Sequence, residues 1–400
     1  MYINNIHRQG ENSMSVTNDI FYAGVNDHQI DLFESQFPVP LGMAYNSYVI
    51  MDEKIAVVDT IEAKFTQEWL GSIKKILQGR KPDYLIVQHM EPDHSASIGA
   101  FKEEYPDAVV VATAQAFKMI GNYFRGLDLG DKKLTAGNET TLELGRHKLV
   151  FYTAPMVHWP EVMMTYDTTD KVLFSADAFG KFGANDVEDP EGWDCEARRY
   201  YFGIVGKFGA QVQAVLKKLG ALEIRQIASL HGPVLSGDLS HYISLYDTWS
   251  SYRPEKQGVT VAYTSVYGNT GKAAKLLAEE LENKGCEDVK IFDLSRDDVY
   301  EALECAFMNE KLVLATTTYN NGIFPAMKKF IDLLTERGYK NRKLAIIENG
   351  SWGPMAAKVI RTSVEGLQNI EILDTITILS SMSPENEEQL RALAEKLSAE

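Results

Sequence analysis

Cysteine is scarce in this sequence, and the few cysteines are scattered. The 400 residues contain three, Cys195, Cys286 and Cys305, and none of them belongs to a CxxC pair. This pattern excludes a disulfide framework and a site in which several thiolates hold iron or zinc. A metal ion bound by this chain must therefore be held by nitrogen and oxygen atoms.

Basic charge and long apolar runs are lacking as well. The formal net charge is −16, which disfavours nucleic acid and anionic membrane surfaces as partners, because both need a basic face. No apolar run reaches the roughly 18 residues of a membrane span, and the N-terminus lacks the pattern of a signal peptide. We therefore expect a cytoplasmic protein with neither a nucleic-acid nor a membrane partner. Residues 1–13 are polar, and with Met14 as an alternative start they form an extension without a role in the core.

Length and apolar patterning predict more than one domain. At 400 residues, 45% of them hydrophobic, the chain is long enough for two or three globular domains. In the first part, short apolar runs separated by turn residues predict strands of an antiparallel or mixed sheet. These runs are residues 21–24, 48–50, 55–59, 84–87, 109–111 and 149–151. Helical spacing of apolar residues over 64–77 predicts a helix that precedes the strand over 84–87.

Four ionisable side chains crowd together directly after the strand predicted over residues 84–87. They are His89, Glu91, Asp93 and His94. Such groups repel or desolvate one another unless a strongly positive partner lies among them, and a bound metal ion is the usual partner. Pro92 disfavours a regular helix here, so we expect these side chains to extend from a loop, with Ser95 as the N-cap of a short helix. The pattern HxExDH predicts half of a two-metal site.

Three more residues that can bind a metal follow strand-like runs further along the chain. They are His158, Asp177 and His231, and each is followed by small or helix-breaking residues. A two-sheet sandwich with its site in the rim loops brings such strand ends to one edge. His147, in a basic turn, and His241, on a helix-like stretch, are interpreted as structural.

A second pattern follows the polar linker over residues 250–258. Strands and helices alternate regularly beyond it, which predicts a doubly wound parallel sheet. The predicted strands are residues 259–263, 289–292, 311–315 and 343–348, and the predicted helices are residues 272–284, 326–336 and 383–397.

Three loops of this sheet predict a flavin site. The first lies between a strand and a helix, so its amides and hydroxyls can bind a phosphate at the positive helix end. It lacks the Gly-Lys-Ser/Thr of a P-loop and the GxGxxG of a dinucleotide fold, which favours a monophosphate such as FMN over ATP or NAD. The indole of Trp352 can cover an isoalloxazine ring. The loop residues are Thr264, Ser265, Val266, Tyr267, Gly268, Asn269 and Thr270, then Thr318, Tyr319, Asn320, Asn321 and Gly322, then Gly350, Ser351, Trp352 and Gly353.

The metal-binding pattern resembles the metallo-β-lactamase fold, whose zinc hydrolases commonly carry HxHxDH followed by single His, Asp and His ligands. Glu91 stands where that motif has its second histidine. Replacing an imidazole by a carboxylate gives a harder and more anionic ligand set, which suits iron or manganese better than zinc. We therefore expect a dinuclear, redox-active site.

From about Val16 onward the chain resembles the flavodiiron proteins, in which a metallo-β-lactamase-like αββα sandwich precedes a flavodoxin-like doubly wound parallel sheet. HxExDH, the later His, Asp and His, and the flavodoxin loop occur in the order of that family. The resemblance implies a diiron domain over residues 14–253 and an FMN-binding domain over residues 254–400. It also implies seven ligands to two non-haem irons, with Asp177 as the bridge. One iron would be held by His89, Glu91 and His158, and the other by Asp93, His94 and His231, although water displaces the equivalent of His94 in some members.

An activity, a donor and an assembly are implied too. Members of the family pass electrons from flavin to iron and reduce oxygen to water or nitric oxide to nitrous oxide. The sequence carries no CxxC-bearing tail, so we expect a separate donor, a rubredoxin or a flavin reductase. Because the two sites belong to different domains, we expect a head-to-tail homodimer or a dimer of dimers. Tyr200 and Tyr201 are candidates for the catalytic proton donor.

Two other classes of function stay open. A metal-dependent hydrolase with an accessory flavodoxin domain would cleave esters or thioesters without flavin, and Glu91 argues against it. An electron carrier or sensor with a vestigial diiron site is opposed by the complete set of ligand residues, and metal content distinguishes it. Preference between oxygen and nitric oxide is not predicted, because both use the same ligands.

Overall fold

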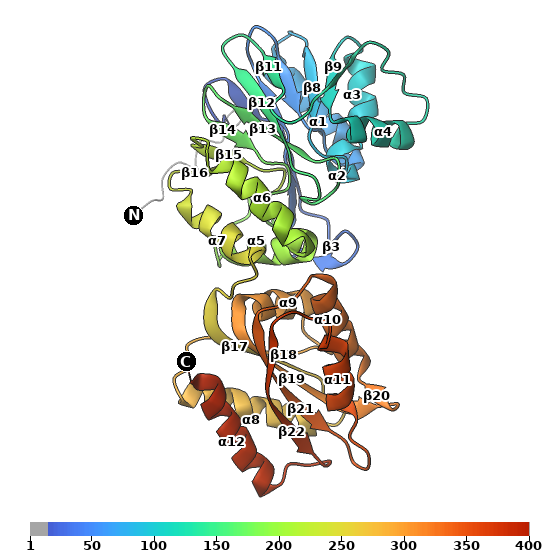
Figure 1. The fold of residues 1–400 in the computed structure, drawn as a ribbon. Helices are drawn as coiled ribbons and strands as arrows, with labels where there is room; N and C mark the ends of the chain where they lie inside the picture. The colour runs from blue at the N-terminus through green and yellow to red at the C-terminus, as the bar shows by residue number, and fades with distance from the viewer. Residues whose placement is uncertain (1–14, 400) are drawn as a thin grey trace. The chain divides into compact units, whose positions relative to one another are not determined.

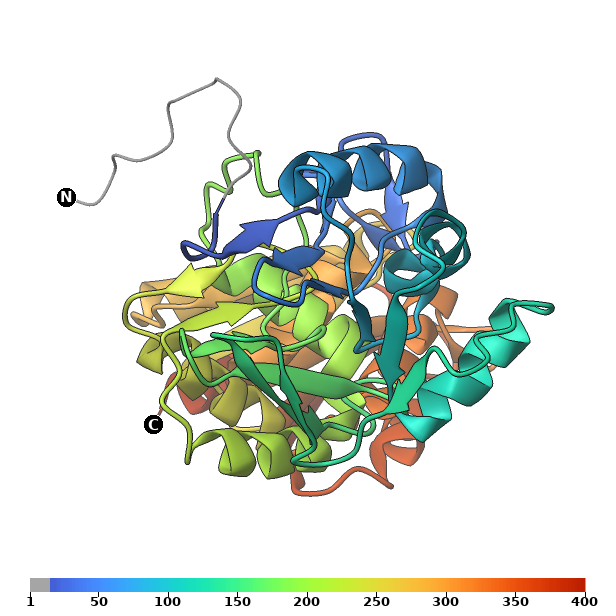
Figure 2. The same ribbon diagram turned by 90° about the horizontal axis from the view of Figure 1, so that it is seen from above.

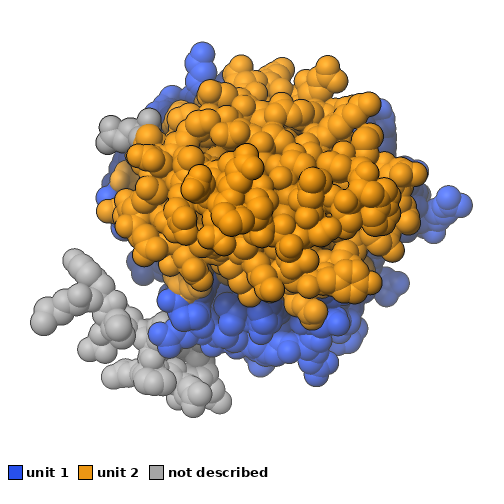
Figure 3. Space-filling model, turned by 90° about the horizontal axis from the view of Figure 1, so that it is seen from below, with its two compact units in different colours: residues 1–33, 39–190, 217–239 blue, residues 34–38, 191–216, 240–400 orange. Residues whose placement is uncertain are grey.

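The computed structural model describes residues 15–399, and they form two compact units. Unit 1 contains the chain up to Phe33 together with Val39–Pro190 and Lys217–Leu239. Unit 2 contains Glu34–Pro38, Glu191–Leu216 and the chain from Ser240 onward, and Figure 3 colours the two units separately. The extension predicted over residues 1–13 lies outside the described residues. The predicted domain boundary between residues 253 and 254 stays a prediction.

Unit 1 is built on two six-stranded sheets. The first has the order β1 (Ile20–Tyr22), β6 (Tyr48–Ile50), β7 (Ala56–Val58), β8 (Tyr84–Val87), β9 (Val109–Ala112) and β10 (Lys133–Thr135). The second has the order β11 (Thr141–Glu143), β12 (Lys148–Thr153), β13 (Met163–Asp167), β14 (Val172–Phe174), β15 (Gln226–Ala228) and β16 (Leu235–Ser236). Shorter strands are β2 (Val25–Asp27), β3 (Leu32–Phe33), β4 (Phe37–Pro38) and β5 (Met43–Tyr45). The blue and green strands of the two sheets form separate layers in Figure 2.

One apolar core lies between these two sheets. Ile86 and Val111 of the first sheet belong to the same buried cluster as Phe151, Met163 and Phe174 of the second. Both contributing faces are rich in branched and aromatic side chains, which pack well on a pleated surface. The core thus holds in register the strand ends from which the predicted metal ligands follow.

The following helices of unit 1 lie beside the first sheet. They are η1 (Ala63–Phe65), α1 (Thr66–Leu77), α2 (Pro92–Ser95), α3 (Ile98–Glu104) and α4 (Ala114–Tyr123). Figure 1 shows α1, α3 and α4 on the outer side of this sheet. In α1 the apolar face predicted from periodicity is buried through Trp69, Ile73 and Ile76, while Lys74 is exposed.

Two local predictions at the motif were wrong. Pro92 does not exclude a helix but begins α2, because a proline at the first helical position gives up an N–H that would have no intrahelical partner. Asp93 and His94 therefore lie on a short helix and not on a loop. Ser95 ends α2 instead of capping the next helix, and its hydroxyl donates to the carbonyl oxygen of Met90 at 2.8 Å.

Unit 2 combines a helical segment with a third sheet. The helical segment contains α5 (Asp194–Tyr200), the π-helix η2 (Tyr201–Val205), η3 (Gly206–Phe208), α6 (Gly209–Leu219), of which the last three residues belong to unit 1, and α7 (Ser240–Ser250). The sheet has the parallel order β18 (Val289–Asp293), β17 (Lys256–Tyr263), β19 (Asn309–Tyr319), β21 (Arg342–Asn349) and β22 (Ile370–Ile378), and β20 (Gly322–Ile323) pairs with β19. This order, 2-1-3-4-5 in chain sequence, is that of flavodoxin-like sheets.

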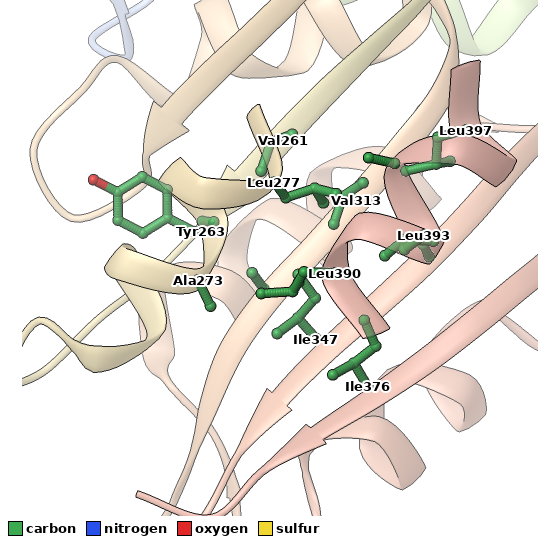
Figure 4. Packing of buried hydrophobic residues seen from close by; sticks show 14 of the residues in the cluster. Val261, Tyr263, Ala273, Leu277, Val313, Ile347, Ile376, Leu390, Leu393 and Leu397 are labelled. Carbon is green, nitrogen blue, oxygen red and sulfur yellow. The ribbon is translucent and has the colours of Figure 1, made fainter. Parts of the chain in front are cut away.

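Helices cover both faces of this sheet. They are α8 (Asn269–Asn283), α9 (Val299–Met308), α10 (Pro325–Glu336), α11 (Ala356–Val364) and α12 (Pro384–Ser398). Figure 4 shows Leu390, Leu393 and Leu397 of α12 packed with Leu277 of α8 against the strands. Because the strands are parallel, the loops after β17, β19 and β21 emerge at one edge, as predicted for the flavin site. Within residues 15–399 no helix has the length and apolar character needed to cross a membrane.

Candidate metal centre and flavin loops

All seven side chains predicted as metal ligands meet in unit 1, in two adjoining clusters. His89 and Glu91 follow β8, Asp93 and His94 lie on α2, and His158, Asp177 and His231 follow β12, β14 and β15. The structure groups His89, Glu91, His158 and Asp177 in one cluster and Asp93, His94 and His231 in the other. This is the grouping that the family resemblance implied.

The first cluster converges on one oxygen of Asp177. The Nε2 atoms of His89 and His158 lie 3.1 Å and 3.0 Å from Oδ2 of Asp177. The same two nitrogens lie 3.3 Å and 3.0 Å from Oε2 of Glu91. They are also only 3.3 Å apart. Two ring nitrogens at this distance need a proton or a cation between them and the carboxylates.

The second cluster faces the other oxygen of Asp177. Oδ1 lies 3.2 Å from Nε2 of His94 and 3.7 Å from Nε2 of His231. Oδ2 of Asp93 lies 3.3 Å from each of these ring nitrogens, which are 3.0 Å from one another. Asp177 therefore presents one oxygen to each cluster, as a bridging carboxylate does.

The contents of the clusters fit a pair of metal ions. Ligand atoms about 2.1 Å from a common ion lie about 3 Å apart when they are neighbours in an octahedron, which matches the distances above. Both oxygens of Asp177 and of Asp93 are buried and lack a hydrogen bond of good geometry to any residue that the structure describes. Buried carboxylates without hydrogen bonds are costly unless they bind a cation. An oxygen-rich set with four imidazoles suits iron or manganese.

Protonation is strongly shifted in the first cluster. Burial lowers the pKa of His89, but Asp177, Glu161 and Glu91 outweigh this effect and raise it well above its usual range. Burial likewise opposes protonation of His158, and the same balance against Asp177 and Glu91 raises its pKa to about 9. The facing imidazoles, His89 first, overcome the effect of burial and hold the pKa of Asp177 well below its usual range. A metal ion would take the place of these protons, so metal binding releases them.

Three groups behind the ligands were missed by sequence reasoning. Oε1 of Glu161 lies 2.8 Å from Nδ1 of His89. A carboxylate oxygen of Asp59 accepts a hydrogen bond from the backbone N–H of His89 at 3.3 Å. The carbonyl oxygen of Ala44 lies 2.8 Å from Nδ1 of His231. Each contact turns Nε2 of its ring, or the segment carrying it, toward the clusters. The one signal in the sequence was the position of Glu161, three residues after a predicted ligand.

Tyr200 and Tyr201 belong to unit 2, whereas both clusters belong to unit 1. Both tyrosines are buried, and the ring of Tyr201 packs against Phe202, Tyr246 and Trp249. These are the contacts of packing residues. The proton-donor role of the two tyrosines stays a prediction.

The predicted flavin loops gather at the carboxyl edge of the third sheet. Gly268 has φ 93°, a left-handed conformation that favours glycine, and it caps the N-terminus of α8. The hydroxyl of Ser265 is buried and has no hydrogen-bond partner among residues 15–399. In contrast, the side chains of Tyr267 and Trp352 are 94% and 96% exposed. A buried hydroxyl beside a helix N-terminus fits a phosphate, and exposed rings on two loops of the same sheet edge, after β17 and β21, are available to pack on a flat cofactor.

Other residues of these loops form hydrogen bonds that connect the loops at this edge of the sheet. Oγ1 of Thr318 accepts hydrogen bonds from the backbone N–H groups of Met355 and Ala356 at 2.9 Å and 3.3 Å, which ties the second loop to the third. The hydroxyls of Ser351 and Ser380 lie 2.9 Å apart. These contacts hold the loops together before any ligand is bound.

Comparison with known proteins matches both parts of the chain to known families. Residues 43–232 match the family described as ODP family beta lactamase, and residues 261–361 match the flavodoxin family. The chain is 31% identical over 368 residues to a nitric oxide reductase of Moorella thermoacetica, covering 90% of this chain and 91% of that protein. It is 29% identical over 363 residues to an anaerobic nitric oxide reductase flavorubredoxin of Salmonella arizonae, covering 88% of this chain and 75% of the relative.

Solved structures show the same architecture over the whole length. A flavodiiron protein from Giardia intestinalis superposes with a TM-score of 0.91 at 25% identity, covering 98% of this chain and 97% of that one. A rubredoxin oxygen:oxidoreductase from Desulfovibrio gigas superposes with a TM-score of 0.90 at 23% identity, covering 97% and 98%. The predicted sandwich followed by a flavodoxin-like sheet is therefore confirmed.

Proposed function

Because the chain belongs to the flavodiiron proteins, we propose that it is an oxidoreductase that reduces oxygen, nitric oxide or both at a non-haem diiron site, with electrons delivered through FMN. One observation carries the proposal. The two buried oxygens of Asp177 each face a separate cluster of imidazole and carboxylate groups, which is the arrangement that a pair of bridged metal ions requires.

Seven side chains are proposed to hold the two irons, as one group of ligands with Asp177 shared. They are His89, Glu91, Asp93, His94, His158, Asp177 and His231. When bound, the irons supply electrons one at a time and an open coordination position for a small oxidant. The chain's own residues hold the four Nε2 atoms toward the carboxylates and keep bulk water away.

Access to the centre is proposed to pass over its least buried ligands. The side chain of Glu91 is 13% exposed and that of Asp93 is 10% exposed, whereas those of His89, His94 and Asp177 are fully buried. A small uncharged molecule and the protons that reduction consumes would reach the site past these two carboxylates. The buried side of the cluster keeps the imidazoles in fixed orientations.

The FMN site is proposed for the loops after β17, β19 and β21. Residues 264–270 would bind the phosphate through backbone N–H groups at the start of α8 and through the hydroxyl of Ser265. The rings of Tyr267 and Trp352 would flank the isoalloxazine. These loops would hold FMN, whose chemistry would be the transfer of single electrons from an external donor.

A separate rubredoxin-like protein or a flavin reductase is proposed as that donor. The names of the relatives above support the choice, since one is a flavorubredoxin and another is a rubredoxin oxygen:oxidoreductase. We further propose a cytoplasmic location and a head-to-tail homodimer or dimer of dimers, because the ligand residues and the flavin loops belong to different units of the chain.

Stopped-flow reoxidation tests the activity. The purified protein is reduced with dithionite under anaerobic conditions and then mixed with oxygen or with nitric oxide in separate runs. Repeated reoxidation of flavin and iron by either substrate supports the proposal and identifies the preferred oxidant. If neither substrate reoxidises the protein, the proposal is wrong, and hydrolysis of esters or thioesters becomes the reaction to assay.

A further inference from the structure

The four imidazoles of the metal centre differ in what lies behind them. Nδ1 of His89 lies 2.8 Å from a carboxylate oxygen of Glu161, and Nδ1 of His231 lies 2.8 Å from the carbonyl oxygen of Ala44. Nδ1 of His94 is buried and has no partner among the described residues. One cluster therefore has an imidazole whose Nδ1 faces a carboxylate, and the other has an imidazole whose Nδ1 faces a backbone carbonyl.

Glu161 is held firmly in this position. Its side chain is fully buried, and Oε1 also accepts a hydrogen bond from the backbone N–H of Met90 at 2.8 Å. Its backbone carbonyl accepts a hydrogen bond from Oγ1 of Thr113 at 2.9 Å. Since both ends of the residue are fixed, the carboxylate cannot turn away from the ring of His89.

We propose that Glu161 is a positioning residue that makes the His89 position hold its metal ion more tightly than the His231 position. The inference rests on the proposed diiron function. A carboxylate that accepts the Nδ1 proton fixes the tautomer and increases the electron density at Nε2, and a neutral carbonyl does this less strongly.

The distribution of charge acts in the same direction. Besides the shared Asp177, the ring nitrogens of His89 lie within 3.3 Å of two carboxylates, Glu91 and Glu161, and Nε2 of His231 lies 3.3 Å from one, Asp93. The buried carboxylate of Asp59 acts on both positions, because it accepts a hydrogen bond from the backbone N–H of His89 and interacts electrostatically with His94. The additional negative charge favours the ferric over the ferrous ion, so the iron at the His89 position is also expected to have the lower reduction potential.

Asp59 offers a matched control for the loss of a buried negative charge, because it lies near His89 without contacting the imidazole ring. It is also a fully buried carboxylate, and directly after β7 it accepts hydrogen bonds from the backbone N–H groups of Gln88 at 2.7 Å and His89 at 3.3 Å. The variants E161Q and D59N therefore each remove one buried charge next to His89, but only E161Q changes the partner of the imidazole.

The test is stepwise removal of iron by a graded chelator from the FMN-loaded holoprotein, measured as iron per FMN. The wild type is expected to lose its two irons in two separate steps. In E161Q the later step moves to a chelator concentration about 10- to 100-fold lower, and in D59N it moves much less. With ⁵⁷Fe, the Mössbauer doublet of one iron changes in E161Q and that of the other does not.

Three outcomes overturn the inference. They are loss of both wild-type irons at one chelator concentration, unchanged steps in an E161Q protein that still binds two irons, and equal shifts in E161Q and D59N. The first needs no variant, so a failure of E161Q to fold leaves the inference testable. A wild-type protein that never binds two irons refutes the proposed function itself.

Discussion

Replacement of Asp177 by asparagine tests whether one carboxylate joins the two metal positions. D177N keeps the size of the side chain but replaces one oxygen by an NH₂ group, which cannot bind a metal ion. E91Q is the matched control, because Glu91 contacts only His89 and His158 of the first cluster. The two variants remove the same charge and the same kind of ligand.

The structure predicts how the losses of metal-binding stabilisation in D177N and E91Q compare. Loss of a group behind a metal ligand costs about 10- to 100-fold in affinity, and loss of a ligand itself costs at least the upper end of that range. A 100-fold loss removes about 2.7 kcal/mol of stabilisation by bound metal at each affected position. Asp177 faces both clusters, so D177N loses about 2.7 kcal/mol at the position whose oxygen becomes NH₂ and about 1.4 kcal/mol or more at the position that keeps a neutral amide oxygen, whereas E91Q loses about 2.7 kcal/mol at one position.

Iron per FMN and thermal unfolding with and without chelator measure these effects. FMN serves as the internal standard, because its proposed loops belong to the other unit. We expect D177N to retain fewer than one iron and E91Q to retain about one, with a loss of iron-dependent thermal stability in the same order. Retention of two irons by D177N, or equal losses in the two variants, refutes the bridging role of Asp177.

Three further predictions concern other parts of the chain. Burial lowers the pKa of His147, but the hydrogen bond with Asp167 outweighs burial and raises this pKa above 6.5. The stability that this protonated histidine contributes is present below pH 6.5 and is lost as the pH rises through the raised pKa. The unfolding free energy in urea should therefore fall over this pH range in the wild type and should not in H147Q. S265A should raise the Kd for FMN by about 10-fold or more, measured by flavin fluorescence, because it removes a hydrogen bond to a charged phosphate. L393A should cost 2–5 kcal/mol of unfolding free energy in urea, because it opens a cavity in the core of Figure 4, whereas L379A, at an exposed position, should change it by less than about 0.5 kcal/mol.

The first four metal ligands could be predicted from the sequence because such a cluster of ionisable residues is locally unusual. Four ionisable groups within six residues after an apolar strand have few explanations other than a metal ion. The same local reasoning failed at Pro92, because it treated proline as a helix breaker at every position, whereas the first turn of a helix accepts it. What a residue favours depends on its place within the element, which spacing alone does not reveal.

Helix α9 was not predicted for a related reason. From Ala302 to Met308 every side chain is buried, so the sequence has no polar face and no helical period. The supports behind the imidazoles were not predictable either. Glu161 reaches His89 across 72 positions of the chain, and Ala44 acts through its backbone, which carries no signal of residue type. Such contacts exist only once the two sheets have packed.

The loop of Asp177 shows how the fold fixes the position of the proposed bridging carboxylate. Ala176 and Phe179 adopt left-handed conformations with φ 50° and 65°, which cost about 1–2 kcal/mol each and persist only where surrounding contacts impose them. Here the N–H of Leu230 donates to the carbonyl of Ala176 at 2.9 Å, which ties this loop to the one that carries His231. A side-chain carbon at Gly180 would lie 2.9 Å from the carbonyl oxygen of Asp177 and 3.3 Å from Cβ of His231. The absence of a side chain at Gly180 therefore allows two predicted ligands from distant parts of the sequence, Asp177 and His231, to share one support.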